Sequence, residues 1–436
     1  MKKIDSIPTR KIERVAKLVT TGVKVGGNYL KYYGEKAINP SLTKDKLHEE
    51  NATDIYDGLK ELKGSALKVA QMLSMEKNLL PQSYVEKFSL SQFSVPPLSA
   101  PLVRKTFKNS FKKYPEEIFD SFTPDSVNAA SIGQVHKAEK DGRQLAVKIQ
   151  YPGVRDSIKT DIALVKPIAV RMFNLQGTSD EYFQEVEDKL TEETDYQLEL
   201  QQSEAVRLAC SQIEGLQFPK YYPEYSSDRI ITMDWMRGQH LSEFCATETN
   251  PEKRQRVAQT LWNFYMYQIH ALRKFHADPH PGNFLVDADG QLIAIDFGCM
   301  KQIPSSFYKP YFEISSPDVL NDAFKFKNKL IELEILKTTD SPAEEKFFTE
   351  LFHELLTLFT QPIQHEEFDF SDASFQQKIA QLSEKFTQDK NLRKMNGNRG
   401  SKHFIYVNRT FFGLYSLMFD IGARVRINDF EKYLKA

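Results

Sequence analysis

The sequence has no long hydrophobic run, only three cysteines and no excess of either charge. A membrane-spanning helix requires ~20 consecutive apolar residues, and the closest approach, residues 411–419, is far shorter and is followed by Asp420. The cysteines lie far apart, which argues against a disulfide framework and favours a reducing compartment. Because 58 basic residues are balanced by 59 acidic ones, the chain offers no global basic field to a nucleic acid.

The N-terminal segment also lacks the features of a targeting sequence. Residues 1–18 contain basic side chains, but they include Asp5 and Glu13 and have no apolar core, so we expect neither a secretory signal nor a transit peptide. Together with the lack of a spanning segment, this predicts a cytoplasmic protein. Peripheral contact with a membrane surface is left open.

Local patterns divide the chain into a helical beginning, a segment with strands and a mostly helical remainder. Apolar residues recur at helical spacing between 51 and 80, before Pro81, and a turn-rich segment at 95–101 predicts a boundary. Beyond it we expect strands at 131–138, 145–150, 229–233 and 292–295, and helices at 102–111, 155–173, 179–213 and 251–275. This order predicts an α+β fold with a small β-containing lobe and a helical lobe, and clefts between lobes commonly bind ligands.

A motif in the second half places two carboxylates and an amide at the spacing of a kinase site. Asn283 follows Asp278 by five residues, as in H-R-D-x-x-x-x-N, where the Asp orients the attacking hydroxyl and the Asn binds Mg²⁺. Asp296, which opens an Asp-Phe-Gly sequence, comes thirteen residues after Asn283, at the end of a short apolar strand. A carboxylate there can hold Mg²⁺ against phosphates, because a hard cation prefers oxygen ligands. The set predicts binding of ATP with Mg²⁺.

Two neighbours of this motif limit what it can do. Ala277 stands where kinases have Arg, so we do not expect control through a phosphorylated activation loop. His276 and His280 have the i, i+4 spacing of a zinc site, but that site needs a shared helix face. Pro279 and Pro281 would break such a helix, so His280 is interpreted as a packing residue of the loop.

The first lobe offers a lysine on a strand. The strand follows an Asp141-Gly142 hairpin turn and carries Lys148 in the place of the V-A-I-K lysine, which contacts the α- and β-phosphates. Such a lysine needs a carboxylate on the following helices, and Glu193, Asp195 and Glu199 are the candidates. The alternative is a solvated acidic helix face.

The glycine-rich loop of ordinary kinases is missing. Ahead of the Lys148 strand, where G-x-G-x-x-G would cover the phosphates, the segment 128–136 has a single glycine, Gly133. Alanine allows a smaller range of backbone angles than the glycines found there in ordinary kinases. We therefore expect a nucleotide cover that is stiffer or differently shaped.

Taken in order, these segments resemble the atypical kinase-like family called ABC1, AarF, UbiB or ADCK. The matching segments are Lys68–Gln71, Ala129–His136, Ala146–Lys148, Glu193–Tyr196 with Glu199, His276–Asn283 and Asp296–Gly298. The resemblance implies a protein-kinase-like two-lobed fold, with a helical N-terminal extension at 1–95, a kinase-like domain at 96–330 and a helical C-terminal region at 331–436. Within the domain it implies a small lobe at about 96–233, a hinge at 234–238 and a large lobe from 239.

The resemblance also implies roles for the extension and the alanine-rich loop. Lys68 and Gln71 match the family's K-x-G-Q motif, a lid over the place where a protein substrate would otherwise sit, although Ala70 replaces the glycine. The residues that match the nucleotide-covering loop are Ala129, Ala130 and Ser131. Asn128 replaces the first of the family's three alanines, a change that would bear on nucleotide preference.

Further roles follow for the acidic segment and the hinge. Glu193 matches the glutamate that is expected to pair with Lys148, and Asp195 and Glu199 would shape the metal and lid network. Asp234, Trp235 and Met236 match the family's hinge, whose backbone would meet the adenine, and Met233 directly before them is also expected to bind the nucleotide.

The resemblance implies an ATP- and Mg²⁺-dependent kinase or ATPase that acts in or supports isoprenoid-lipid or ubiquinone metabolism. ATP or ADP and Mg²⁺ are then the cofactors, Asp278, Lys148 and Glu193 the catalytic residues, and Asn283 and Asp296 the metal ligands. A lipid or quinone precursor is a further ligand to consider, and nucleic acid is not. Two alternatives stay open: a nucleotide-binding scaffold with little turnover, and a small-molecule phosphotransferase of the aminoglycoside or choline kinase type. The sequence names neither the phosphate acceptor nor the oligomeric state.

Overall fold

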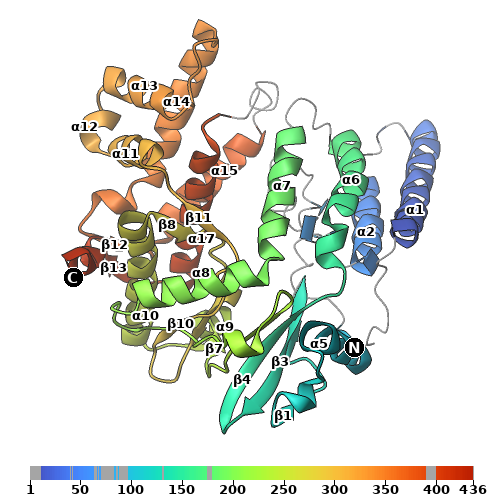
Figure 1. Ribbon diagram of the computed structural model, residues 1–436. Helices are drawn as coiled ribbons and strands as arrows, with labels where there is room; N and C mark the ends of the chain where they lie inside the picture. The colour runs from blue at the N-terminus through green and yellow to red at the C-terminus, as the bar shows by residue number, and fades with distance from the viewer. Residues whose placement is uncertain are drawn as a thin grey trace. The chain divides into compact units, whose positions relative to one another are not determined.

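The computed structural model describes the chain over residues 11–39, 41, 43–62, 66, 68–69, 83–84, 87, 97–129, 132–173, 179–388 and 399–435. The chain is grouped into two compact units. Unit 1 comprises Met1–Leu200 and Lys220–Trp235, and unit 2 comprises Gln201–Pro219 and Met236–Ala436. Figure 1 labels helices and strands of both units.

Unit 1 contains an antiparallel sheet. Its strands are β1 (Ser121–Phe122), β2 (Asn128–Ala129), β3 (Gly133–Lys140), β4 (Arg143–Gln150) and β6 (Ile230–Asp234). β3 pairs with β1, β2 and β4, and β4 pairs in turn with β6. The β3–β4 hairpin turns at Asp141 and Gly142, whose φ angles of 50° and 73° fit the two-residue turn predicted for an Asp-Gly pair.

Alternation along β4 decides which side chains enter the core of unit 1. Leu145, Val147 and Ile149 belong to its main hydrophobic cluster, together with residues of the flanking helices. Ala146 belongs to a smaller cluster on the other face of the sheet. Because successive strand residues point to opposite faces, Lys148 lies on the same face as Ala146.

The helices of unit 1 flank this sheet. They are α1 (Lys11–Ile38), α2 (Asp45–Leu62), α5 (Ala100–Phe111), α6 (Val154–Phe173) and α7 (Ser179–Glu193), with short turns at Pro115–Glu117 and Pro223–Tyr225. α1 runs beside α2, and α6 beside α7 (Figure 1). α8 (Tyr196–Ala209) begins in unit 1 and continues into unit 2.

The single helix predicted over 179–213 is wrong, because the chain breaks between α7 and α8. Asp195 lies in the break, and its side chain accepts a hydrogen bond from the backbone N–H of Leu198 at 3.1 Å. This is the geometry of a helix N-cap, in which a short carboxylate satisfies a donor of the first turn. The new helix therefore starts at Tyr196, and the side chains beyond it take a new register.

Unit 2 is mainly helical, with several short strands. Its strands are β5 (Leu216–Gln217), β7 (Gln239–His240), β8 (Lys274–His276), β9 (Phe284–Val286), β10 (Leu292–Ala294), β11 (Met300–Gln302), β12 (Glu367–Asp369) and β13 (Arg424–Arg426). Its helices are α9 (Leu241–Thr247), α10 (Pro251–Tyr267), α11 (Ser305–Glu313), α12 (Pro317–Leu320), α13 (Ala323–Glu332), α14 (Pro342–Phe359), α15 (Ala373–Gln388) and α17 (Lys402–Ile421). The sheets have the orders β5-β10-β9-β7, β11-β8 and β12-β13.

The helix α10 forms the centre of unit 2. Leu261 and Phe264 are fully buried, and burying such a side chain stabilises a fold by about 1.5–3 kcal/mol. The helix predicted over 251–275 is too long: α10 ends at Tyr267 and is followed by a π-type turn at Gln268–Leu272. Arg273 then takes a left-handed conformation with φ 52°, which redirects the chain into β8.

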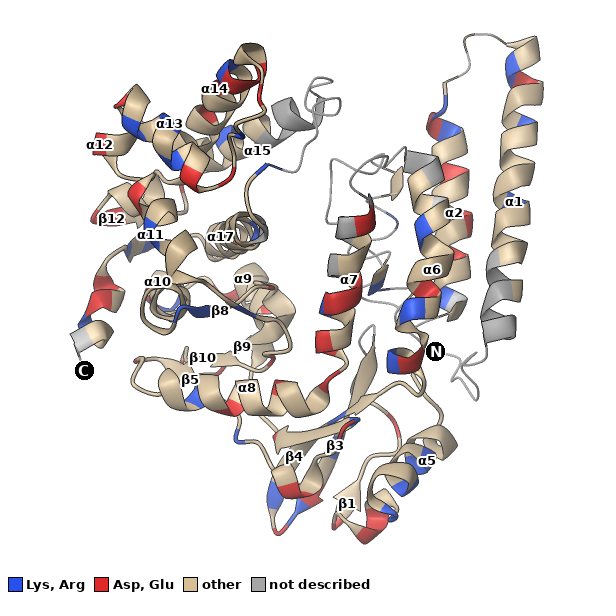
Figure 2. Cartoon of the chain, turned by 45° about the horizontal axis from the view of Figure 1, so that its top comes forward, with Lys and Arg blue, Asp and Glu red and all other residues tan. Residues whose placement is uncertain are grey.

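Charged side chains of both signs are interspersed along the helices of unit 2, as Figure 2 shows for α11, α13 and α14. Several of them pair, including Lys327 with Glu345 at 2.6 Å and Lys329 with Glu313 at 2.7 Å. This distribution agrees with the balanced charge of the sequence. Within the described ranges, every helix is too short or too polar to cross a membrane.

Candidate functional site

The segments that carry Asp278 and Asp296 are joined by backbone pairing within unit 2. β8 leads into Asp278 and pairs with β11, which follows the Asp-Phe-Gly sequence, so that His276 lies opposite Met300. The pairing continues by one step, because the N–H of Ala277 donates to the carbonyl of Cys299 at 2.8 Å. The two predicted acidic residues therefore lie on adjacent segments.

Asn283 joins the same arrangement through the β9–β10 hairpin. The N–H of Ile295 donates to the Asn283 carbonyl at 3.0 Å, so Asp296 follows the strand that pairs beside Asn283. The Nδ2 of Asn283 donates to the backbone carbonyl of Asp278 at 2.9 Å, which closes the loop between them. All three predicted side chains are half-buried. Their placement agrees with the predicted site, while their chemical roles stay predictions.

Aromatic packing fixes the position of the Asp-Phe-Gly sequence. Phe297 is buried and contacts the rings of Phe218, Phe264 and His276. Directly before it, the Oδ1 of Asp296 accepts a hydrogen bond from the N–H of Gly298 at 3.0 Å. This packing anchors the backbone on both sides of the Asp296 carboxylate.

The side chain of Asp278 lies near Tyr265 of α10. Burial, and then the negative charge of Asp278, raise the pKa of Tyr265 well above its ordinary value. Tyr265 therefore stays neutral over the physiological pH range. Tyr265 is a fully buried packing residue of α10 and does not act as a base.

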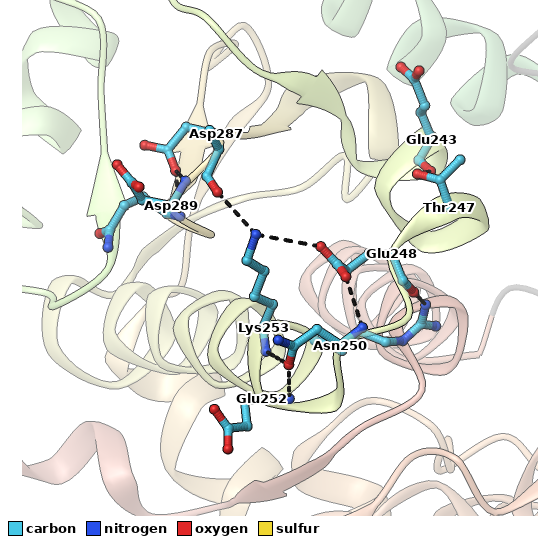
Figure 3. Close-up of polar contacts among 11 residues, drawn as sticks. Glu243, Thr247, Glu248, Asn250, Glu252, Lys253, Asp287 and Asp289 are labelled. Carbon is cyan, nitrogen blue, oxygen red and sulfur yellow. Dashed lines mark hydrogen bonds and ion pairs between the residues drawn. The ribbon is translucent and has the colours of Figure 1, made fainter.

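The far end of the β9–β10 hairpin is attached to α10, as Figure 3 shows. Lys253 donates to the carbonyl of Ala288 at 3.1 Å and lies 3.8 Å from Glu248. The turn itself is closed by Asp287, whose Oδ1 accepts from the N–H groups of Asp289 and Gln291 at 3.0 and 2.8 Å. The hairpin that carries Asn283 and Asp296 is thus held at both ends.

The donor set suits Mg²⁺ bound together with phosphates. Because the Nδ2 of Asn283 is used by Asp278, its Oδ1 is the side offered to a ligand. A half-buried carboxylate and an amide oxygen are too few to enclose a cation, and no group of three or more His, Cys, Asp or Glu that could hold one occurs among the residues with a described placement. Mg²⁺ is commonly held by one or two carboxylates and by oxygens of the substrate phosphates, so these residues fit it.

In unit 1, the expected pair of Lys148 with Glu193 is wrong. The Nζ of Lys148 donates to the Oε1 of Glu199 at 2.6 Å, and their side chains are only 14% and 5% exposed. Glu193 instead pairs with Lys68 of the N-terminal extension at 3.1 Å.

The reason for this exchange of partners lies in the break at Asp195. Tyr196 and Glu199 are three residues apart on α8 and so share one face of that helix. Both meet Lys148, whose ammonium also stands 5.3 Å from the centre of the Tyr196 ring. Glu193 ends the preceding helix and faces Lys68. In addition to capping α8, the carboxylate of Asp195 lies 3.6 Å from the guanidinium of Arg155.

The predicted lid and loop residues lie partly outside the described residues. Lys68 is described, whereas Gln71, Ala130 and Ser131 are not, and Ala129 is described only as part of β2. Their predicted roles stay predictions.

The single glycine of the alanine-rich segment is explained by packing. A Cβ at Gly133 would lie 2.7 Å from the carbonyl oxygen of Ile149 and 2.8 Å from the hydroxyl of Tyr196. Atoms do not approach a Cβ this closely, so only glycine allows the start of β3 to lie against β4 and α8. Gly133 thus brings together the start of β3, the Lys148 strand and the helix of Glu199.

Met233 and the first two residues of the predicted hinge, Asp234 and Trp235, are bonded within unit 1. Met233 lies opposite Ala146 in the β4–β6 ladder. The N–H groups of Asp234 and Trp235 donate to the carbonyls of Lys220 and Gln144, each at 2.9 Å. The carboxylate of Asp234 accepts from the Tyr222 hydroxyl at 2.8 Å. Asp234 therefore supports the strand end, and the two N–H groups are already used.

Sequence reasoning assigned no role to a buried network at Gln134 and His136. Both side chains are fully buried. Gln134 accepts from the N–H of Leu98 at 2.7 Å, and its amide lies 2.7 Å from the His136 Nε2. The Nδ1 of His136 lies 2.8 Å from the Thr123 carbonyl. The sequence could have indicated this network, because Gln134 and His136 are two residues apart on a strand and therefore lie on the same face.

The network requires a neutral His136. All groups are satisfied when Nδ1 carries the proton and donates to Thr123, and Nε2 accepts from the Gln134 amide. Burial lowers the pKa of His136 below its ordinary 6.5. The unfolded chain therefore binds this proton more readily than the folded one, so the contribution to stability is complete above pH 6.5 and is lost as the pH falls below it.

We predict that His136→Asn makes the unfolding free energy less sensitive to a fall in pH. Between about pH 7.5 and about pH 5.5, wild type should lose more unfolding free energy than the variant, by up to about 1.4 kcal/mol per pH unit. Urea unfolding at both pH values measures this difference. His240→Gln, at an exposed position, is the control and should follow wild type. An equal pH dependence in His136→Asn and wild type would contradict the neutral network.

Comparisons with known proteins agree with this geometry. The family model described as the ABC1 atypical kinase-like domain matches residues 90–329. An uncharacterised chloroplastic aarF domain-containing protein kinase of Arabidopsis thaliana is 28% identical over 354 residues, which cover 77% of this chain and 48% of that protein. An uncharacterised protein of Synechocystis is 31% identical over 308 residues, 68% of this chain and 53% of that protein. The chain thus spans about half the length of these relatives.

A solved structure has a similar fold. It is a complex of the Mycobacterium tuberculosis protein Rv3197 with erythromycin, and it aligns with a TM-score of 0.62 and 25% identity. The alignment covers 89% of this chain and 96% of that one. A protein-kinase-like fold, with mixed helices and sheets, is therefore confirmed.

Proposed function

Since the chain belongs to the ABC1 atypical kinase-like family, we propose that it binds ATP with Mg²⁺ and transfers or hydrolyses the γ-phosphate. The observation that carries the proposal is the closed loop of unit 2, in which Asn283 bonds to Asp278 and lies beside the strand that leads to Asp296. Asp278 and Asn283 of that loop, with Asp296 after β10, are the two carboxylates and the amide that phosphoryl transfer uses in kinases. Relatives of the chain are named as kinases, which supports kinase-like chemistry.

Each residue has a definite task in this proposal. Asp278 orients the attacking hydroxyl or water and receives its proton, while the Oδ1 of Asn283 and the carboxylate of Asp296 hold Mg²⁺. Bound Mg²⁺ supplies neutralisation of the phosphate charge. Lys148 contacts the phosphates, and its hydrogen bond to Glu199 keeps it oriented.

The adenine is proposed to meet the backbone of the hinge. The N–H groups of Asp234 and Trp235 are used inside unit 1, so the next backbone donor along the hinge, the N–H of Met236, is the one proposed to meet the base. Met233 precedes the hinge on the β6 strand. ADP fits the same groups as ATP.

The acceptor is proposed to be a lipid or a quinone precursor, reached at a membrane surface from the cytoplasmic side. The support is the family's link to isoprenoid lipids, and the solved structure of the mycobacterial neighbour is itself a complex with a small molecule, erythromycin. The assay of turnover should therefore include lipid vesicles and phenolic quinone-precursor mimics.

Thermal shift in the presence of Mg-ATP tests the proposed binding. We expect wild type to gain about 2.7 kcal/mol of stability at a nucleotide concentration 100-fold above the dissociation constant. Asp296→Asn should lose this Mg²⁺-dependent gain, because an amide cannot replace the charge of the carboxylate as a ligand. Its fold should persist, since Asn can still accept from the N–H of Gly298.

The control is Asp289→Asn, which makes the same change at an exposed position on the β9–β10 turn. It should keep the wild-type shift. An unchanged Mg²⁺-dependent shift in Asp296→Asn would refute the metal site.

A further inference from the structure

The helix α17 contacts the loop of residues 278–283, called the catalytic loop below. This helix lies beyond residue 329, where the match to the family model ends. The contact is between Gly413 of α17 and Pro279, the residue after Asp278. A Cβ on Gly413 would overlap the Cγ of Pro279 and would lie 3.2 Å from its carbonyl oxygen and 3.4 Å from its Cβ. The helix can approach the loop this closely only because Gly413 has no side chain.

The loop could not easily yield to a larger residue at this point. The ring of proline is closed onto the backbone, so its atoms cannot rotate away as a flexible side chain would. The loop is also bonded on both sides of Pro279, by Ala277 to Cys299 and by the amide of Asn283 to the Asp278 carbonyl. A push on Pro279 therefore moves Asp278 with it.

The helix α17 could not easily yield either. Arg254 of α10 donates to the carbonyls of Ile421 and Asp420, at 2.6 and 2.9 Å, at the C-terminal end of α17. This satisfies carbonyls that have no partner within the helix and places a cation at the negative end of its dipole. In the middle of α17, the Tyr415 hydroxyl donates to the Phe359 carbonyl at 3.0 Å.

The same arginine also holds the C-terminal end of α9. Arg254 donates to the carbonyls of Cys245 and Glu248, both at 2.9 Å, at the end of α9. α9 packs against the turn Pro281–Asn283 and against α17. Two helices fixed through one side chain therefore support the segment from Asp278 to Asn283.

We infer that Gly413 is a positioning residue, which sets the place of Asp278 by allowing α17 to lie directly against Pro279. Its effect on turnover rests on the proposed function, whereas its effect on the loop does not. Misplacing a catalytic group by about 1 Å can cost about 10²-fold in rate. The helix α17 then helps to hold the loop that carries Asp278 in place.

Gly413→Ala tests the inference. We expect kcat for phosphate release from Mg-ATP to fall by about 10- to 100-fold, with KM for ATP changed by less than about threefold, because Asp278 is displaced more than Asp296. Gly26→Ala is the control, since it makes the same change in a helix where nothing lies within 4 Å of the added Cβ. It should match wild type.

A second change separates this mechanism from general damage. Pro279→Ala removes the Cγ that the new Cβ would strike, so Gly413→Ala/Pro279→Ala should recover to the activity of Pro279→Ala alone. Unchanged kcat in Gly413→Ala would overturn the inference. So would a loss of activity, or a failure to fold, that Pro279→Ala does not relieve.

Hydrogen exchange distinguishes failure of this inference from failure of the proposed function. The backbone amides of 277–283 should exchange at least about tenfold faster in Gly413→Ala than in Gly26→Ala, with or without nucleotide. If wild type neither binds nor turns over Mg-ATP, this faster exchange would still support the positioning role. Unchanged exchange in that case would overturn it.

Discussion

Asp278→Asn is expected to lower kcat for phosphate release from Mg-ATP by about 10²–10⁴-fold and to leave the affinity for Mg-ATP close to that of wild type. Asparagine has the size of aspartate but cannot take a proton from the attacking hydroxyl or water. The bond between the Asn283 amide and residue 278 uses the backbone carbonyl, so the variant keeps it. Loss of rate without loss of binding is the mark of a group that acts in the transition state.

The measurement is steady-state phosphate release, with and without lipid vesicles and phenolic quinone-precursor mimics. Equal turnover in Asp278→Asn and wild type would exclude this residue as the base. Tight binding of ATP without stimulated release in wild type would favour the nucleotide-binding scaffold. Phosphorylation of aminoglycosides or choline would favour the small-molecule phosphotransferase.

The parts of the fold that sequence predicts well depend on neighbouring residues. The β3–β4 hairpin was predictable because Asp141 and Gly142 suit positive φ angles and apolar residues alternate along the strand that follows. The grouping of Asp278, Asn283 and Asp296 was predictable because the short strands between Asn283 and Asp296 pair directly, as do the strands before Asp278 and after Asp296. In each case the information lies within about thirty residues of chain.

The parts of the fold that the sequence analysis missed are those that the apolar pattern of the sequence does not determine. A continuous helix over 179–213 fits the apolar pattern, but the cap at Asp195 ends it and changes which carboxylate faces β4. The contact of Gly413 with Pro279 joins residues far apart in the chain and leaves no local pattern. Such features follow from packing, which sequence periodicity does not encode.

The exchange of partners among the lysines and glutamates of unit 1 gives the second large prediction. Glu199→Gln should lower the unfolding free energy by about 3–5 kcal/mol, because it removes the negative charge that the ammonium of Lys148 contacts at 2.6 Å in a largely buried site. Turnover should fall as well, since Lys148 loses the bond that orients it. Glu193→Gln should also destabilise the fold, through Lys68, but should leave affinity for Mg-ATP near wild type.

Double-mutant cycles decide between the two pairings. Unfolding free energies of single and double variants should show coupling of about 1–3 kcal/mol between Lys148 and Glu199, and between Lys68 and Glu193, since each pair is in direct contact. The crossed cycle of Lys148 with Glu193 should give coupling below about 0.5 kcal/mol. Strong coupling in the crossed cycle would restore the pairing that the family resemblance implied. Its absence would make the N-cap at Asp195 the feature that assigns Glu199, and not Glu193, to the phosphate-binding lysine.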